Sequence, residues 1–142
     1  MSERENVGLV QQPYSAFGRQ DTETIVSMFS EDATLKGPAP AGKLPWGGVY
    51  HGRQGVVQFF RSLGDSLEVS VFEPREFIAQ GDRVVVLGYQ RGRAKPTGRP
   101  YETEFAHVFT LRGGKIVEFQ SFADSASLAE SLQKTMVSPE IS

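Results

Sequence analysis

Few residues of this chain are placed to move a proton, and Asp124 is the most prominent of them. It stands where an apolar segment, KIVEFQSFA, gives way to a Ser-rich stretch. A carboxylate beside an apolar cavity has its pKa raised by desolvation and can transfer protons near neutral pH. Asp124 also immediately precedes SASLAESL, where aspartate is a preferred helix N-cap, and a capped carboxylate is a poor base. The sequence is compatible with both roles.

A nine-residue segment, LPWGGVYHG at positions 44–52, has an unusual composition for a connecting loop. It holds Trp46, the only tryptophan, together with Tyr50 and His51. We expect this segment to close the open end of an internal cavity, with Trp46 as an apolar wall and Tyr50 or His51 polarising an oxygen of a bound molecule. The alternatives are a packed loop anchor for Trp46 and a hydrogen-bonded helix entry for the other two.

The composition excludes several kinds of site. The chain has 142 residues and no cysteine, which excludes disulfides, thiolate catalysis and cysteine-ligated metal centres. Its two histidines are far apart and give no metal-ligand spacing. No Walker loop, dinucleotide fingerprint or nucleophile elbow occurs. We therefore expect neither a metal nor a cofactor.

The charge pattern argues against two classes of partner. A net charge of −2 gives no general attraction to nucleic acid or to anionic membranes. The basic stretch RGRAKPTGR lacks interleaved aromatic residues and is expected to be a solvated loop. No apolar run approaches the ~20 residues that span a bilayer, and the first residues lack the apolar core of a signal peptide. We expect a cytoplasmic protein that binds neither nucleic acid nor membrane.

Helical periodicity begins near the N-terminus. Residues 6–18 carry an apolar stripe that includes Tyr14 and Phe17, and Pro13 interrupts it. Because proline donates no backbone hydrogen bond, either the helix kinks at Pro13 or a second helical piece begins there. Tyr14 either points its hydroxyl into the cavity or is an ordinary core tyrosine. Phe17 is a candidate for the cavity lining.

Three further helices are predicted. Asp21 is a candidate N-cap for a helix that continues through Phe29. A helix over 53–64 has Phe60, another candidate lining residue, in its apolar stripe. A short final helix is expected over 125–132.

From residue 67 the apolar period changes to two, which is typical of β-strands. Pro74 marks a bulge or break in the first long strand, and Gly113-Gly114 is a two-residue hairpin signal. The chain is therefore predicted to be α+β, with three helices covering one face of a mostly antiparallel sheet and a short C-terminal helix. We expect a single domain over residues 1–142, whose strands include DATLKGP, LEVSVF, EFIA, RVVVLGYQRGR, YETEFAHVFTL and KIVEFQSFA.

The glycine turn fixes the expected register of the last hairpin, since pairing can be counted outward from it. In that count Leu111 lies opposite Ile116, and one face carries small side chains that leave room for a cavity. His107 falls on the opposite, outer face, as an interface histidine unless a local bulge turns it inward. The residues expected to line the cavity from the hairpin are Glu104, Ala106, Val108, Phe119 and Ser121; solvation is the alternative for Glu104.

Both faces of this hairpin are substantially apolar. Helices can cover only one of them, so the outer face is expected to bind a second copy of the chain. The sequence thus predicts a homodimer that forms through the outer face of the sheet.

Three segments resemble the NTF2-like superfamily, and within it the SnoaL-like and ketosteroid-isomerase-related proteins. They are FSEDATL, WGGVYHGRQGVVQFF, and TGRPY with the run HVFTLRGGKIVEFQSFAD. The resemblance implies a cone of three helices against a strongly curved sheet, with a deep apolar cavity between them. It also implies that dimers through the outer sheet face are common. The fold hosts enzymes as well as non-catalytic binders, so it does not by itself give the function.

The catalytic residues of the steroid isomerase do not carry over. That enzyme uses an aspartate base and an oxyanion hole formed by a tyrosine and a protonated aspartate. The resemblance places these at Gly37, at Pro13 for the tyrosine, and at Ala106 for the second carboxylate. Steroid isomerisation by that mechanism is not expected.

Two other branches of the superfamily point to Asp124. Limonene-epoxide hydrolases use an Asp–Arg–Asp constellation, of which one aspartate maps onto Asp124, while the others fall near Gly88 and Gln90. SnoaL-type polyketide cyclases use an acidic residue near the end of the last strand, which again maps onto Asp124. The expected function is binding of a small apolar organic molecule, with cofactor-free isomerisation, dehydration, cyclisation or epoxide hydrolysis as the possible reaction. The alternative is a non-catalytic ligand-binding or protein-interaction module.

Overall fold

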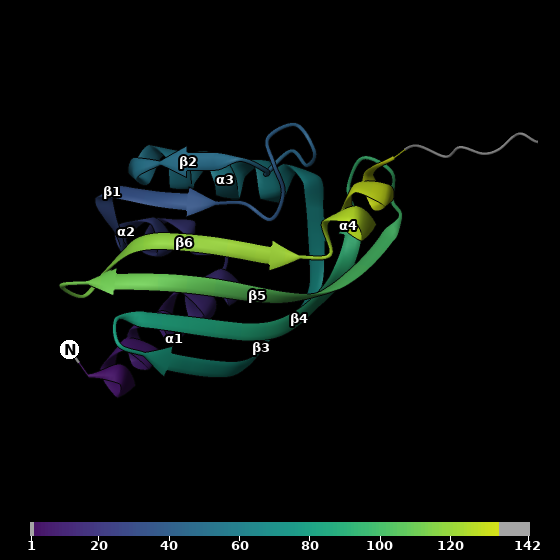
Figure 1. The fold of residues 1–142 in the computed structure, drawn as a ribbon. Coiled ribbons are helices and arrows are strands. Elements are labelled where there is room, and N and C mark those ends of the chain that lie inside the picture. Colours follow the sequence, from purple (N-terminus) through teal and green to yellow (C-terminus); the bar gives the residue numbers. More distant parts are fainter. Residues whose placement is uncertain (1, 134–142) are drawn as a thin grey trace, which may run out of the picture.

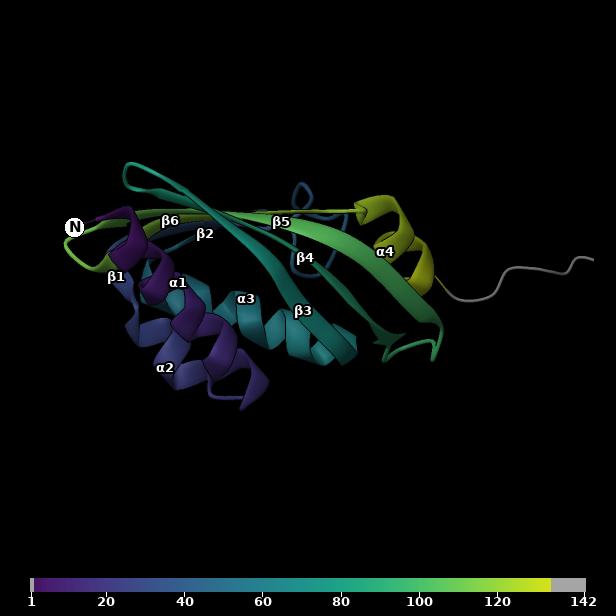
Figure 2. The same cartoon turned by 90° about the horizontal axis from the view of Figure 1, so that it is seen from below.

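The computed structural model describes residues 2–133 of the 142-residue chain. None of the helices in this range is long and apolar enough to cross a membrane. The strands form one layer and three of the helices form a second layer beneath it (Figures 1 and 2). In chain order the elements are α1 (Glu3–Gly18), α2 (Thr22–Ser27), β1 (Phe29–Lys36), β2 (Val49–His51), α3 (Gly52–Ser66), β3 (Leu67–Gln80), β4 (Arg83–Ala94), β5 (Pro100–Arg112), β6 (Lys115–Ala123) and α4 (Ser125–Leu132).

The described strands form one sheet in the order β2-β1-β6-β5-β4-β3. Strand β1 pairs with β6 in parallel, and all the other neighbours are antiparallel. The three N-terminal helices lie on one face of the sheet, and α4 lies at its end, directly after β6 (Figure 2). Figure 2 also shows that the sheet is strongly curved, so that its β3–β5 end wraps toward α3. This confirms the predicted α+β architecture.

Irregularities in β3 account for the curvature. Its pairing with β4 shifts at two places, between Val69 and Val71 and between Pro74 and Glu76. A bulge bends its strand and increases the local twist. Opposite these shifts β4 has Gly88 and Gly92, where a Cβ atom would lie 2.5 Å and 2.0 Å from the carbonyl oxygens of β3 residues. Only glycine permits so close an approach of the two backbones, and the sheet can therefore fold over the helices.

Helix α1 is one continuous element that includes Pro13, so the predicted second piece does not form. Its start is well defined, because the Ser2 hydroxyl accepts from the Glu5 backbone N–H while the Glu5 carboxylate accepts from the Ser2 backbone N–H. Pro13 is buried and faces the sheet, as Val10 does. The prolyl side chain therefore contributes to the interior surface of the helix.

Helix α2 begins at the predicted cap and ends earlier than predicted. The Asp21 carboxylate accepts from the Thr24 backbone N–H at 3.1 Å. Phe29 was expected in this helix, but it is the first residue of β1 and pairs with Ile116 of β6. The apolar residues before β1 are too few for their spacing to distinguish a helix from a strand. Here Phe29 is buried as a strand residue and does not extend the helix.

The C-terminal helix α4 is fixed at both ends. Asp124 is its N-cap, and the loop between β4 and β5 holds its last turn. The Thr97 hydroxyl donates to the Ser131 carbonyl at 2.6 Å, and the Arg99 guanidinium donates to the Glu130 carbonyl at 3.1 Å. These bonds satisfy carbonyl groups that a helix end leaves without partners. Leu128 is thereby held against the rest of the core, with 2% of its surface exposed.

The predicted register of the β5–β6 hairpin is correct only next to the turn. Arg112 pairs with Lys115 and Leu111 with Ile116, but Thr110 pairs with Glu118, so that one residue of β6 is skipped. The skipped residue is Val117, which makes this a β-bulge. Beyond the bulge every partner differs by one from the expected count.

The bulge reverses the expected faces of β5. Phe105, His107 and Phe109 point toward the helices and are buried, so His107 is not the interface histidine that was predicted, and the alternative of a local bulge applies. Since side chains alternate along a strand, their neighbours point away from the helices. The residues expected to line the cavity from β5 therefore lie on the outer face instead: Glu104, Ala106 and Val108.

Candidate functional site

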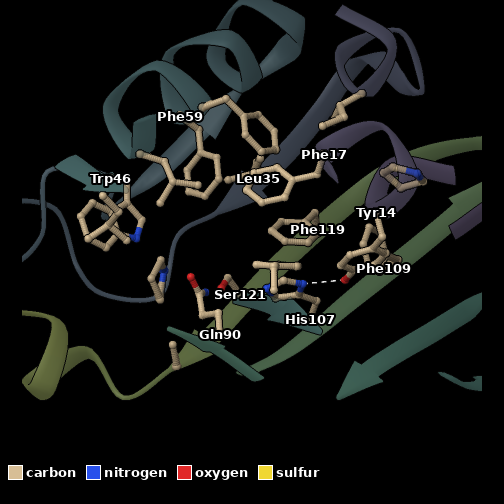
Figure 3. A pocket seen from close by; sticks show the side chains of 18 of the residues that line it. Tyr14, Phe17, Leu35, Trp46, Phe59, Gln90, His107, Phe109, Phe119 and Ser121 are labelled. Carbon is tan, nitrogen blue, oxygen red and sulfur yellow. Dashed lines mark hydrogen bonds between the residues drawn. The ribbon is translucent and has the colours of Figure 1, made fainter. Parts of the chain in front are cut away.

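A cavity of about 90 Å³ lies between the helices and the concave face of the sheet (Figure 3). A water molecule needs ~10–15 Å³, so the space suffices for more than water. Side chains from α1, α2, α3, α4 and five strands surround it. Its lining is Pro13, Tyr14, Phe17, Ile25, Phe29, Leu35, Pro38, Trp46, Phe59, Phe60, Leu63, Leu67, Phe72, Gln90, His107, Phe109, Phe119, Ser121, Ala123 and Leu128.

The walls are mainly aromatic. Phe119 meets Phe109 edge-on, with ring centroids 4.9 Å apart, and Phe17 lies 4.8 Å from Phe72. Centroid distances of this size are those of favourable aromatic pairs. Among the described residues, none that lines the cavity carries a formal charge apart from a titratable histidine. The cavity is therefore suited to an apolar, planar guest.

His107 is the titratable group in the cavity, and Tyr14 holds it. Nδ1 of His107 lies 2.6 Å from the Tyr14 hydroxyl, and the two rings are nearly parallel (Figure 3). The imidazole also stacks on Phe105 with centroids 4.2 Å apart. The contacts with Tyr14 of α1 and Phe105 of β5 fix the ring plane from two sides. The remaining ring nitrogen, Nε2, is left for another partner.

Burial keeps this pair uncharged. Desolvation lowers the pKa of His107 to about 3, and it raises the pKa of the Tyr14 hydroxyl well above its ordinary value. At neutral pH the pair is a neutral imidazole bonded to a neutral phenol. A neutral imidazole of this kind binds an oxygen through its N–H but accepts a proton poorly. The arrangement therefore favours hydrogen-bond donation over proton abstraction.

Two more polar groups share the cavity with His107. Gln90 of β4 accepts from the Tyr101 hydroxyl at 2.9 Å through Oε1, which leaves its amide N–H groups available. Ser121 of β6 pairs directly with His107 across the strands. Within residues 2–133 neither the Ser121 hydroxyl nor Nε2 of His107 forms a hydrogen bond. Every fully buried polar side-chain atom in this range has a partner, so these two atoms are not fully buried. Both groups therefore keep their hydrogen-bonding capacity for the cavity.

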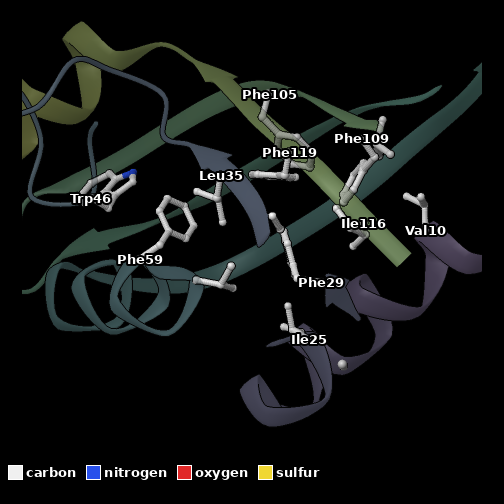
Figure 4. Packing of buried hydrophobic residues seen from close by; sticks show 14 of the residues in the cluster. Val10, Ile25, Phe29, Leu35, Trp46, Phe59, Phe105, Phe109, Ile116 and Phe119 are labelled. Carbon is white, nitrogen blue, oxygen red and sulfur yellow. The ribbon is translucent and has the colours of Figure 1, made fainter. Parts of the chain in front are cut away.

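The loop between β1 and β2 delivers Trp46 to the cavity. The loop is closed by its own backbone, with hydrogen bonds from Gly37 to Gly48 at 2.9 Å and from Gly48 to Ala39 at 2.8 Å. A Cβ atom on Gly47 would lie 2.6 Å from the Pro40 carbonyl oxygen, so the fold of the loop requires glycine there. Trp46 has 2% of its surface exposed and forms a wall beside Leu35 and Phe59 (Figure 4).

Tyr50 and His51 do not line the cavity, although they follow Trp46 closely. Tyr50 is half-buried and meets the Phe59 ring edge-on with centroids 5.6 Å apart. His51 is exposed and occupies the N-cap position of α3 without a capping hydrogen bond from its side chain. The structure therefore does not bring these two residues to the expected site.

Asp124 also lies outside the cavity. Its carboxylate accepts from the Ser127 backbone N–H at 3.1 Å and from the Ser127 hydroxyl at 2.9 Å. These bonds, the backbone bond foremost, lower the pKa of the carboxyl group. Of its two predicted roles the structure shows the N-cap. An exposed carboxylate with a lowered pKa is a weak base, and we assign Asp124 no acid–base role.

The structure brings together only some of the predicted site residues. Tyr14, Phe17, Trp46, Phe60, His107, Phe119 and Ser121 line one cavity, whereas Glu104, Ala106 and Val108 do not. Sequence reasoning does not identify Gln90 as a cavity residue. Gln90 lies on the same face of β4 as Val84 and Val86, which are fully buried, because side chains alternate along a strand. The alternation in the sequence could therefore have identified it.

Comparison with known proteins places this arrangement in a family. The model of the SnoaL-like domain matches residues 10–119, which is more than half of the chain. The chain belongs to the SnoaL-like family. The matched segment runs from α1 into β6 and includes Tyr14, Trp46, His107 and Phe119. No curated protein matches the chain.

Solved structures of similar proteins share the fold. An NTF2-like protein from Burkholderia xenovorans LB400 is 31% identical, with a TM-score of 0.83 over 94% of this chain and 99% of its own. An NTF2-like protein of unknown function from Burkholderia pseudomallei K96243 is 30% identical, with the same TM-score and coverage. TerC, co-crystallised with polyporic acid, is 30% identical, with a TM-score of 0.79 over 89% of this chain and 97% of its own. The predicted NTF2-like fold is confirmed.

Proposed function

We propose that this SnoaL-like protein binds a small, mostly apolar organic molecule in its cavity and recognises one oxygen atom of that molecule through His107. The observation that supports this is the neutral His107–Tyr14 pair, joined at 2.6 Å inside an aromatic cavity. In the tautomer whose Nδ1 accepts from the Tyr14 hydroxyl, Nε2 carries the hydrogen. That N–H is the donor for the ligand oxygen.

The other cavity groups narrow the class of ligand. The Gln90 amide adds donors and the Ser121 hydroxyl adds a donor or an acceptor, so a carbonyl or phenolic oxygen fits best. Burying a localised charge here would be unfavourable, because the described lining residues supply no counter-charge. Phe109 and Phe119 favour a flat ring system. TerC, a 30% identical relative, was crystallised with polyporic acid, which supports an oxygenated organic ligand.

Calorimetric titration with phenol, a neutral aromatic molecule with one oxygen, tests the proposal. The variant His107→Phe keeps an aromatic ring at this position but removes both nitrogen atoms. Loss of the hydrogen bond from Nε2 to the ligand oxygen should weaken binding about tenfold. The same substitution at the exposed histidine, His51→Phe, is the matched control and should leave the affinity unchanged. Equal affinities of wild type and His107→Phe would contradict the role of His107, and no binding to wild type would contradict the ligand class.

The same geometry favours a cofactor-free proton-transfer reaction as a second candidate. A carbonyl oxygen that accepts from His107 Nε2–H is polarised, which favours loss of a proton from the adjacent carbon to water and stabilises the enolate oxygen. No carboxylate base lines the cavity within residues 2–133, so any rate enhancement is expected to be modest. Deuterium exchange at the α-carbon of 2-tetralone, followed by NMR, checks this; an equal rate with His107→Phe would rule it out.

We also propose that two copies of the chain associate through the outer sheet face and that the protein acts in the cytoplasm. The support for association is apolar exposure: Phe122, Leu87 and Ile78 have 49%, 37% and 45% of their surfaces exposed on that face. Phe122 and Leu87 pair with Ala106 from opposite sides, and Ile78 pairs with Val85, two residues before Leu87 on the same strand. A contiguous apolar patch on a strand face typically marks an interface.

The proposal that the protein acts in the cytoplasm is supported by its composition, which contains no cysteine and so fits a reducing compartment.

A further inference from the structure

A second hollow, of about 600 Å³, adjoins the cavity where α1, α3 and the beginning of β3 meet. We call it the outer groove; it is open to solvent, whereas the cavity is lined mostly by buried side chains. Five residues line both spaces, and they come from the three elements that meet there (Figure 2). The shared residues are Phe17, Phe60, Leu63, Leu67 and Phe72.

The cavity is too small to enclose a whole organic ligand of ordinary size, so part of such a ligand would have to lie in the outer groove. Sites that enclose small organic ligands usually measure ~300–1,000 Å³. A cavity of about 90 Å³ is well below this range and holds little more than the part of a ligand that contacts His107. A larger ligand must extend beyond it, and the shared residues mark the direction in which the adjoining space lies.

The junction between the two spaces is built from side chains that can move. Phe17 stands in the last turn of α1, and its ring lies 6.4 Å from Phe60 and 4.8 Å from Phe72. All three residues are half-buried, unlike the closely packed Phe59 and Phe109. Rotation of an aromatic side chain with free surface on one side needs no rearrangement of the backbone. Phe17 can therefore admit a chain of methylene width between cavity and groove.

The groove has an apolar floor and a polar rim. Phe60, Leu63 and Leu67 form the floor, while the rim includes the exposed Ser70 and Lys95. The Glu68 carboxylate, which also lines the groove, is engaged by Arg93 at 2.7 Å. An uncharged apolar chain can lie on the floor, and its far end reaches water at the rim.

We propose that cavity and outer groove form one two-part site for a ligand with a hydrogen-bonding aromatic head and an apolar tail. The proposal rests on the proposed function, since the head is the part that His107 recognises. The head occupies the cavity, the tail passes Phe17, and the tail lies along α3 in the outer groove. Ligand selection by tail length is the consequence.

Gly64 allows a clean test, because it lines the groove and not the cavity. Nothing lies within 4 Å of a Cβ atom built on it, so a larger side chain there meets open groove space. It lies inside α3, where replacing glycine by another residue also favours the helix. Gly64→Phe therefore obstructs the groove, and Gly64→Ala is the matched control with almost no added volume.

The experiment compares phenol with 4-hexylphenol by calorimetric titration. A fully buried methylene strengthens binding about fourfold, and one on an open groove floor about twofold. We expect wild type and Gly64→Ala to bind 4-hexylphenol at least about tenfold more tightly than phenol. Gly64→Phe should lose most of that gain and keep the affinity for phenol, with an unchanged circular dichroism spectrum.

Two outcomes overturn the two proposals separately. If phenol binds in a His107-dependent manner but the hexyl chain gives the same gain in Gly64→Phe as in Gly64→Ala, the tail lies elsewhere and the two-part site is wrong. If neither phenol nor 4-hexylphenol binds to wild type, or His107→Phe binds phenol equally well, the proposed function fails and the two-part site fails with it.

Discussion

Burial decides what His107 can do. The imidazole is enclosed by Tyr14, Phe105 and Phe119, and it has exchanged water for one hydroxyl partner at 2.6 Å. Its neutral state follows from this loss of solvent rather than from any nearby charge. The residue is thus a fixed hydrogen-bonding group for an oxygen atom in the cavity.

The titration of His107 should appear in the pH dependence of stability. Its pKa is about 3 in the folded protein and ~6.5 when unfolded, so the unfolded chain binds the additional proton between these values. The free energy of unfolding should therefore fall as the pH decreases from 6.5 toward 3, with a contribution of up to ~1.4 kcal/mol per pH unit from this residue. Urea titrations between pH 4 and pH 8 measure it.

Comparison of wild type with the variant His107→Phe isolates the contribution of His107. Carboxyl groups with lowered pKa values, such as Asp21 and Asp124, also lose stabilisation in acid, but they do so in both proteins and cancel in the difference. The difference between wild type and variant should shrink or change sign below pH 6.5. A pH-independent difference would show that the imidazole has the same pKa in the folded and unfolded states and is therefore not desolvated in the fold.

Substitutions of Asp124 should affect the C-terminal helix. Asp124→Ala removes the acceptor of two bonds from Ser127 and should lower the free energy of unfolding, because α4 loses its N-cap. Asp124→Asn keeps a capping oxygen and should lose less. Chemical denaturation of both variants, alongside phenol titration, separates the roles. A strong loss of ligand binding in Asp124→Asn at unchanged stability would restore Asp124 as a functional group.

Residue types alone identify part of the site. Trp46 and Tyr14 are found by their unusual placement in a loop and in an apolar stripe, and the structure puts both at the cavity. Asp124 is identified as a cap by its position directly before the final helix. The direction in which His107 points cannot be obtained in this way, because it depends on the shift in strand pairing at Val117, which a count outward from the Gly113-Gly114 turn does not reveal.

At the scale of the elements, the β-bulge at Val117 determines which side chains meet in the cavity. It lets Phe109 and Phe119 pair directly and turns His107 and Ser121 to the same face. A one-residue change of register exchanges the two faces of a strand, so one extra residue decides between cavity and outer surface. The bulge thus positions the candidate site.

Deletion of Val117 should lower the free energy of unfolding by more than the loss of one half-buried valine side chain would. Either the hairpin turn shifts or β6 turns Phe119 and Ser121 outward, and we expect the free energy of unfolding to fall by more than about 3 kcal/mol. The matched variant Val117→Thr keeps the residue count and a β-branched side chain, and should lose less than about 1.5 kcal/mol. Thermal unfolding compares them. Similar stabilities of the two variants would mean that the bulge does not set the register.

The sequence predicts elements better than it predicts their pairing. Capping residues and apolar periods locate α2 and α4, and the glycine pair locates the β5–β6 turn. The bulge escapes prediction because no glycine or proline marks it, and valine at position 117 is an ordinary strand residue. Its presence depends on the fit of both strands to the helices, which is a property of the packed protein.

At the scale of the whole molecule, the outer sheet face exposes apolar side chains that the helices α1, α2 and α3 do not cover (Figure 2). Phe122, Leu87 and Ile78 are exposed there among half-buried neighbours such as Val85 and Val108. The helices α1, α2 and α3 cover the opposite face (Figure 2). This distribution is the basis for the proposed homodimer.

Placing a charge in that face should weaken association. Phe122→Glu buries a carboxylate against an apolar partner and should raise the dimer dissociation constant at least about tenfold. Val49→Glu is the matched control, since Val49 is 55% exposed but lies on the edge strand β2, away from the patch. Sedimentation equilibrium measures both. A monomeric wild type, or equal dimerisation of wild type and Phe122→Glu, would contradict the proposed interface.

The attachment of α4 has a consequence for the cavity. Leu128 lines the cavity, while Thr97 and Arg99 of the β4–β5 loop hold the last turn of the same helix. Guest molecules that contact Leu128 favour the docked helix over a frayed one, and by linkage a docked helix favours the guest. Occupancy of the interior and order at the C-terminal end of the fold are therefore coupled, so a substitution as distant as Thr97 can alter affinity without touching what is bound.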